Sequence, residues 1–196
     1  MMFPIENNDT FLLFFHGLDS SCETSKYTCI KREPKYCQTV NYREHFAEIF
    51  KIYDALIQEK MQEYPRVVLA GHSLGAWFAN HFAHKYNLRA LLIAPCIYPS
   101  EVLADRIPAV ADMKLSFPTS NTEMMRVMVE VDDESLDVAV ARRTLVNLPD
   151  SWEVDYFDGG HHRIARSSDI WYICVKTLSF GWMRRRIMVK IRIFDD

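Results

Sequence analysis

Short, continuous apolar runs alternate along the chain with longer segments in which apolar residues recur every three or four positions. Residues 10–15, TFLLFF, form one such run and end at His16, which is typical of a strand covered on both faces of a sheet. Residues 43–64 have the helical spacing and stop at Pro65, so they predict an amphipathic helix. We expect further strands at 36–40, 66–70, 89–94, 125–131 and 152–157, and further helices at 74–86, 135–147 and 167–178. This alternation predicts an α/β fold with three layers around a mostly parallel sheet.

A single domain over residues 1–183 accounts for this pattern, with residues 99–124 forming a small cap between two strands. The apolar cap residues would either line an acyl pocket or pack the cap onto the domain, and both alternatives stay open because such side chains look alike in sequence. These residues are Leu103, Ile107, Val110, Met113, Leu115 and Phe117.

Residues 184–196 form a basic tail in which isoleucine and valine alternate with other residues, a spacing that predicts a strand. We expect this tail to pair as an edge strand, with a homodimer as one outcome. Its run of arginines at 184–186 is more typical of a solvated face than of a site for nucleic acid or an acidic substrate.

Composition excludes several classes of partner. The chain has 23 Lys and Arg against 26 Asp and Glu, a formal net charge of -3, so it has no global basic field for nucleic acid or anionic lipid. No apolar run reaches the ~18 residues of a membrane span, and no signal-peptide pattern opens the chain. We therefore expect a soluble, cytoplasmic protein with no membrane partner.

The five cysteines contain no C-x-x-C pair, and their odd number favours reduced thiols over a disulfide framework. Cys22, Cys29 and Cys37 lie close in sequence, but their spacing does not match that of common zinc sites. We expect no metal there.

Residues 71–75, GHSLG, form a G-x-S-x-G motif between an expected strand and an expected helix. In this context the motif predicts a sharp turn that projects Ser73 above the sheet as a nucleophile, with Gly71 and Gly75 required by close packing and His72 orienting the turn. The amide of Leu74, at the helix N-terminus, is the expected oxyanion donor. The plainer alternative is a tight turn with an ordinary serine.

His16 and Gly17 follow the first strand and predict a second element of the same site. A loop at this position can direct the amide of Leu18 toward the same oxyanion. We interpret His16 and Gly17 as orienting residues, with neither acting as the base.

A serine nucleophile needs a histidine base and a carboxylate, which follow it in the order Ser, Asp or Glu, His in this kind of fold. His161 and His162 follow two glycines at the end of the last expected strand, which places them better than the histidines inside the helix after Ser73. For the acid, residues 132–137, DDESLD, follow an expected strand, and these carboxylates are also suited to capping the next helix. From the residues alone, the choice within this acidic segment stays open.

These segments together resemble the small bacterial esterases of the YqiA type, a compact branch of the α/β-hydrolases. Residues 16–21, HGLDSS, are similar to that family's H-G-F-[ND]-S-S loop, and residues 71–75 match its G-x-S-L-G elbow. Residues 132–137 resemble its G-D-E-x-L-D segment, with Asp132 in place of glycine, and residues 159–162 its G-G-x-H segment. The resemblance therefore implies Asp133 as the acid and His162 as the base.

The resemblance also implies an α/β-hydrolase fold and hydrolysis of short or medium acyl esters or thioesters without a metal or organic cofactor. We predict a serine hydrolase that forms an acyl-enzyme through a triad of Ser73, Asp133 and His162. One alternative is an acyltransferase or peptidase that uses the same residues, because these activities differ from ester hydrolysis only in the acceptor and the substrate pocket. The other alternative is a noncatalytic binding module of the same fold.

Overall fold

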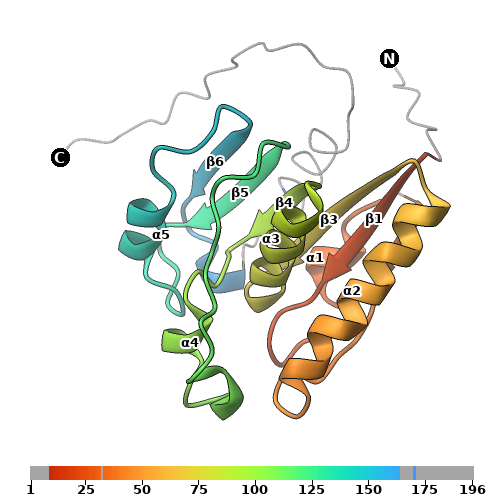
Figure 1. The fold of residues 1–196 in the computed structure, drawn as a ribbon. Coiled ribbons are helices and arrows are strands. Elements are labelled where there is room, and N and C mark those ends of the chain that lie inside the picture. Colours follow the sequence, from red (N-terminus) through yellow and green to blue (C-terminus); the bar gives the residue numbers. More distant parts are fainter. Residues whose placement is uncertain (1–8, 32, 164–169, 171–196) are drawn as a thin grey trace.

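The computed structural model describes residues 9–31, 33–163 and 170. Its centre is a six-stranded sheet in the order β2-β1-β3-β4-β5-β6, in which neighbouring strands pair in parallel (Figure 1). Strand β2 lies on one side of β1, and β3 to β6 follow in order on its other side, so the strand order reverses at β1. Ligands of open α/β folds bind at the carboxyl ends of the strands, next to such a reversal. The strands are β1 (Thr10–Phe15), β2 (Lys35–Cys37), β3 (Arg66–His72), β4 (Arg89–Ile93), β5 (Met125–Glu130) and β6 (Trp152–Phe157).

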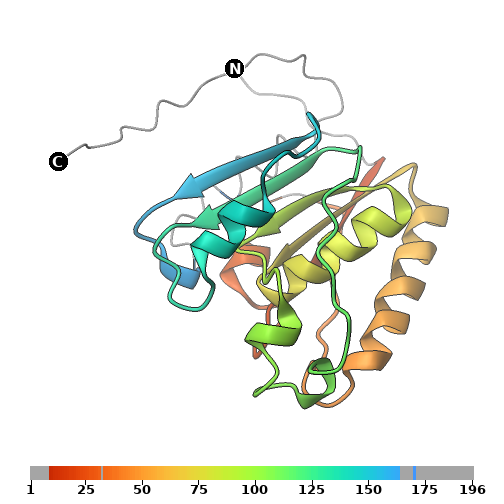
Figure 2. The ribbon, with the colours of Figure 1, turned by 60° about the vertical axis from the view of Figure 1, so that its left-hand side comes forward.

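Helices cover both faces of the sheet, so the layers are helix, sheet and helix. The helices α2, α3 and α5 lie on one face, and α1 lies on the other (Figure 2). The short α4 and η1 belong to the segment between β4 and β5, and η2 follows β6. The helices are α1 (Ser25–Thr28), α2 (Phe46–Glu63), α3 (Leu74–Tyr86), α4 (Pro99–Val102), η1 (Pro108–Val110), α5 (Val138–Thr144) and η2 (His161–Arg163).

Strand β1 shows why its residues form a central strand. Every one of its side chains is buried, and successive side chains point to opposite faces. Phe11, Leu13 and Phe15 join the core beneath α2 and α3, whereas Leu12 and Phe14 join the core on the other face. The predicted three-layer α/β architecture is confirmed.

Three predicted elements, 10–15, 74–86 and 152–157, have the bounds that the sequence indicates. Strand β3 extends to His72, two residues beyond the predicted end, whereas other elements are shorter than predicted. Strand β2 ends at Cys37 instead of residue 40, because the amide of Val40 turns away to donate to His16 Nε2 at 3.0 Å. Helix α2 begins at Phe46 instead of residue 43, because Asn41 Oδ1 accepts a hydrogen bond from the amide of residue 43 in a turn at 3.1 Å.

The cap residues favour one of the two alternatives left open by the sequence. Leu103, Ile107, Val110 and Phe117 are buried in the core beneath α3, so they pack the cap onto the domain. The predicted helix at 167–178, except residue 170, and the predicted tail strand at 184–196 lie outside the described residues.

The expectation of reduced thiols is wrong for Cys22 and Cys37, which form a disulfide with their Cα atoms 5.6 Å apart. The parallel pairing of β1 and β2 causes this, because it brings the end of β2 beside the loop that follows β1. Cys29 and Cys96 are free. The cysteine count therefore gives no support to a reducing compartment.

Within the described part of the chain, no helix combines the length and apolar character needed to cross a membrane. The same residues contain no cluster of three or more His, Cys, Asp or Glu side chains suited to hold a metal ion.

Candidate active site

Ser73 lies in the tight turn between β3 and α3, with a backbone φ of 55° and ψ of −120°. A positive φ is costly for a residue with a side chain and is maintained only where the surroundings impose it. Here the Ser73 amide donates to the carbonyl of Ile93 at 2.9 Å, and the Ser73 carbonyl accepts from the amide of Cys96 at 3.2 Å. The end of β4 therefore holds the strained turn from the side.

Gly71 and Gly75 allow the turn to approach its neighbours closely. A Cβ on Gly71 would overlap the carbonyl of Gly75, and a Cβ on Gly75 would overlap the carbonyls of Phe15 and His16. All of these obstacles are backbone atoms, which cannot rotate away. The two glycines thus bring the start of α3 against the end of β1.

A line of hydrogen bonds joins three of the predicted site residues. His162 Nε2 lies 3.0 Å from Ser73 Oγ, and His162 Nδ1 lies 2.8 Å from Asp133 Oδ2. With the proton on Nδ1 donated to Asp133, Nε2 is the acceptor for the serine hydroxyl. The side chains of Asp133 and His162 are 4% and 19% exposed, so this line is largely sheltered from water.

Asp133 is also fixed by the backbone that follows it. Its Oδ1 accepts hydrogen bonds from the amides of Ser135 at 2.8 Å and Leu136 at 2.9 Å. Burial by itself would raise the pKa of Asp133, but the His162 ring and these two amides lower the pKa overall. The carboxylate is therefore ionised and oriented toward His162.

The loop that holds His162, residues 160–162, is bound by the acidic segment 130–134 at successive positions. Three consecutive backbone amides of the loop donate to three different carboxylates, while Asp133 binds the ring. The pairs are Gly160 to Glu130 at 3.3 Å, His161 to Asp132 at 3.3 Å and His162 to Glu134 at 3.0 Å. The side chain of His161 itself is 67% exposed and lies beside Asp132 and Glu134.

His72 supports the same loop from the side of the elbow. Its Nε2–H donates to the carbonyl of His162 at 3.0 Å, and the two rings have centroids 5.1 Å apart. Burial lowers the pKa of His72 to about 4, so the ring is neutral at pH 7.

The loop after β1 lies directly against the elbow. A Cβ on Gly17 would meet His72 Nδ1 at 3.2 Å and Ser73 Cβ at 3.3 Å. His16 is fully buried, and it donates from Nδ1 to the carbonyl of Gly17 at 2.8 Å while Nε2 accepts from Val40. Burial lowers the pKa of His16, although the Gly17 carbonyl opposes this shift. These contacts place Leu18 next to the turn that holds Ser73, and Leu74 opens helix α3 beside it.

Sequence reasoning missed an ion cluster at the tip of this loop. Asp19 accepts two hydrogen bonds from Arg43, both at 2.7 Å, and one from Arg106 at 2.5 Å. These arginines lie 24 and 87 residues away along the chain, so no local pattern pointed to them.

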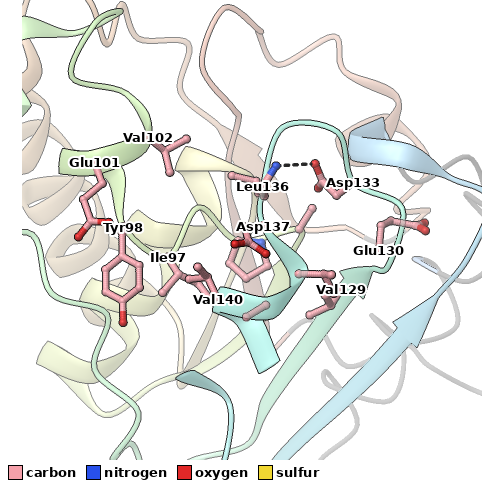
Figure 3. Close-up of a pocket in the computed structure, with 14 residues that line it drawn as sticks. Ile97, Tyr98, Glu101, Val102, Val129, Glu130, Asp133, Leu136, Asp137 and Val140 are labelled. Carbon is pink, nitrogen blue, oxygen red and sulfur yellow. Dashed lines mark hydrogen bonds between the residues drawn. The ribbon is translucent and has the colours of Figure 1, made fainter. Parts of the chain in front are cut away.

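A pocket opens on the other side of the site (Figure 3). Tyr98 and Val102 form one wall, and Val129 and Asp133 lie opposite them. The wall residues Ala94 and Pro95 lie between the two residues whose backbones bond Ser73, so the pocket adjoins the candidate site. The complete lining consists of Ala94, Pro95, Ile97, Tyr98, Glu101, Val102, Val129, Glu130, Asp133, Leu136, Asp137, Val138, Val140 and Ala141.

The parallel sheet with its strand order, the strained serine turn after β3 and the aspartate and histidine after β5 and β6 define the α/β-hydrolase class of fold. Within that class the chain belongs to the family described as Uncharacterised protein family (UPF0227), which matches residues 11–148. This is the YqiA-like family, so the resemblance drawn from the motifs is confirmed.

Solved structures agree on the fold. Est1E from Butyrivibrio proteoclasticus has a TM-score of 0.69 at 9% identity, covering 89% of this chain and 91% of its own. An esterase domain from Rhodothermus marinus has a TM-score of 0.65 at 14% identity, with 87% and 85% covered. The Pyrococcus furiosus esterase Pf2001 has a TM-score of 0.64 at 14% identity, with 88% and 82% covered. No curated protein matches the chain.

Proposed function

We propose that this chain is a serine hydrolase that cleaves carboxylic esters or thioesters. The observation that carries the proposal is the hydrogen-bonded line from Ser73 Oγ through His162 to Asp133, at the end of a strained turn. Such a line supplies a nucleophile, a base and a carboxylate that fixes the base.

The proposed reaction has two halves. Ser73 Oγ attacks the substrate carbonyl as His162 Nε2 takes the hydroxyl proton, and Asp133 stabilises the resulting imidazolium. The C–O or C–S bond then breaks, His162 returns the proton to the leaving alcohol or thiol, and the acyl group stays on Ser73. A water molecule next gives a proton to His162 and attacks the acyl-enzyme, and the acid is released as Ser73 regains its proton.

The oxyanion of each tetrahedral intermediate is assigned to the amides of Leu18 and Leu74. The packing of Gly17 against Ser73 and the position of Leu74 at the start of α3 support this assignment. One such donor typically contributes a factor of about 10² to 10³ to kcat.

The pocket beside Asp133 is the proposed place for an apolar part of the substrate, because most of its lining is aliphatic or aromatic. Val140→Trp would reduce its space, whereas Val146→Trp, at a position that is 54% exposed and not part of the lining, is the matched control. We expect Val140→Trp to lower kcat/KM for bulky esters more than for acetate, and the control to leave the profile unchanged. An unchanged profile in both variants would remove the pocket from the substrate site.

The test of the function is turnover of a series of p-nitrophenyl esters and acyl thioesters by the wild type, Ser73→Ala and His162→Ala. Because Est1E from Butyrivibrio proteoclasticus is known with ferulic acid bound, the series includes an aromatic acyl ester. His161→Ala is the matched control, since its ring is exposed and its contacts are with Asp132 and Glu134. We expect both site variants to lose at least about 10³-fold in kcat while folded, and the control to stay active. A folded wild type that neither turns over substrate nor reacts with a fluorophosphonate at Ser73 would contradict the proposal and favour a binding module.

A further inference from the structure

Two loops on the β1 side of the site are joined along their length. We call residues 16–22, after β1, the oxyanion loop, and residues 37–43, from the last residue of β2 toward α2, the brace. The brace contacts the start, the middle and the end of the oxyanion loop. From start to end, the contacts are Val40 N to His16 Nε2 (3.0 Å), Tyr42 Oη to the His16 carbonyl (2.9 Å), Arg43 to Asp19, Thr39 Oγ1 with the Cys22 amide (3.4 Å) and the Cys22–Cys37 disulfide.

The contact at the middle of the loop, between Asp19 and two arginines, holds a strained backbone position. Asp19 follows Leu18 directly and has a φ of 55°, in the left-handed region that an aspartate tolerates better than most residues. Arg43 binds both oxygens of its carboxylate, through Nε and Nη2, and Arg106 binds Oδ2 as well. A shift of the Asp19 backbone would thus break three charge-assisted hydrogen bonds together.

Arg106 extends this cluster to the cap. It lies between α4 and η1, and its carbonyl accepts a hydrogen bond from Arg43 Nη1 at 2.9 Å. Arg43 therefore bonds the oxyanion loop and the cap at once. Three groups of its guanidinium, Nε, Nη1 and Nη2, bind protein oxygens, an arrangement suited to holding backbone in place.

The cluster is exposed, and isolated ion pairs at such positions usually contribute little to stability. Its effect is expected on geometry, because a small displacement of an oxyanion donor is costly in the transition state but not in ground-state binding. The acid also stays ionised: the arginine hydrogen bonds lower the pKa of Asp19 to about 2.

We propose that Asp19, held by Arg43 and Arg106, is a positioning residue that orients the Leu18 amide and couples the oxyanion loop to the cap. This inference rests on the proposed function, because it concerns the oxyanion of that reaction. It predicts that loss of the cluster lowers kcat and leaves KM nearly unchanged.

The experiment compares Asp19→Ala, Asp19→Asn, Arg43→Ala and Arg43→Lys with the wild type on the best p-nitrophenyl ester. The matched control is Lys85→Ala, which removes another exposed pair, Lys85–Asp54 at 2.5 Å, between α3 and α2. We expect kcat of Asp19→Ala and Arg43→Ala to fall about 10- to 100-fold, less than the loss of a whole donor. Affinity for a trifluoromethyl ketone, which places an oxyanion in the site, should fall by the same factor.

Conservative variants separate positioning from a merely structural role. Asp19→Asn tolerates a positive φ and keeps one acceptor oxygen, so its kcat should lie between those of Asp19→Ala and the wild type. Arg43→Lys keeps the positive charge but not the bidentate hydrogen bonds, so it should recover less of kcat. Unchanged kcat in folded Asp19→Ala, or a change in KM alone, would overturn the inference. Failure of the proposed function would look different, since the wild type itself would then be inactive and unlabelled at Ser73.

Discussion

His72 Nε2 donates a hydrogen bond of 3.0 Å to the carbonyl oxygen of His162, so the residue before the proposed nucleophile holds the backbone of the proposed base. The two residues are 90 positions apart in the chain, yet their rings lie 5.1 Å apart at their centroids. Any movement of the loop after β6 is therefore transmitted to the turn after β3.

His72→Ala should lower kcat by up to about 10-fold with little change in KM, because one hydrogen bond worth about 1 kcal/mol no longer fixes the His162 loop. His72→Gln places a donor near the position of Nε2 and should restore most of the rate. Steady-state kinetics on folded variants checks this. Equal rates for the wild type and His72→Ala would show that the contact does not position the base.

The same residue should make the fold sensitive to acid. Burial lowers the pKa of His72 to about 4 from its ordinary value of 6.5, so the unfolded chain takes up this proton at a higher pH than the folded chain. Stability is therefore complete above about pH 6.5 and falls as the pH drops toward 4, by at most about 1.4 kcal/mol per pH unit for one proton. Urea unfolding at pH 7, 6 and 5 should show a shallower loss for His72→Gln than for the wild type. Parallel pH dependences would contradict this assignment.

Glu134→Ala removes the acceptor of the His162 amide and should lower kcat several-fold. The loop 160–162, which holds His162, then loses one of its three backbone contacts with carboxylates and fixes the ring less well. Glu134→Gln retains an acceptor oxygen and should remain near the wild-type rate. Glu63→Ala, which breaks an exposed 2.8 Å pair with Lys60 on α2, is the control and should not affect turnover. A larger loss in Glu134→Gln than in Glu134→Ala would exclude this explanation.

Cys22→Ser should destabilise the fold by up to about 3 kcal/mol, the contribution expected for a disulfide that closes a loop of about 15 residues. Cys29→Ser, at a free thiol in the same region, should have a much smaller effect. Non-reducing peptide mapping identifies the bond, and chemical unfolding with and without reductant measures its contribution. If the disulfide is present without reductant and the free energy of unfolding is the same with and without reductant, the expected stabilisation is disproved.

The sequence was most informative where a local pattern determines the structure. The continuous apolar run at 10–15 becomes a strand with every side chain buried, and helix α3 begins and ends where its spacing indicates. Helix α5 begins at Val138 instead of the expected residue 135, because the amides of Ser135 and Leu136 bind Asp133 and Asp137 caps the helix through the amide of Ala139 at 2.7 Å. One aspartate of this acidic segment, Asp133, thus contacts the ring of His162, while another, Asp137, caps the helix.

The rest of the site depends on contacts between distant segments, which no local pattern encodes. Asp19 lies in a motif that the sequence singled out, but its partners Arg43 and Arg106 are ordinary surface residues until the fold brings them together. The Cys22–Cys37 bond was missed for the same reason, since an odd cysteine count says nothing about which loops the strands place side by side.

The attachment of consecutive amides in loop 160–162 to carboxylates of segment 130–134 has a consequence for how this family can vary. The two stretches run past each other in fixed alignment, so a residue gained or lost in one would shift every pairing and turn the ring of His162 away from Asp133. Insertions and deletions should therefore be excluded from both stretches or occur in them jointly.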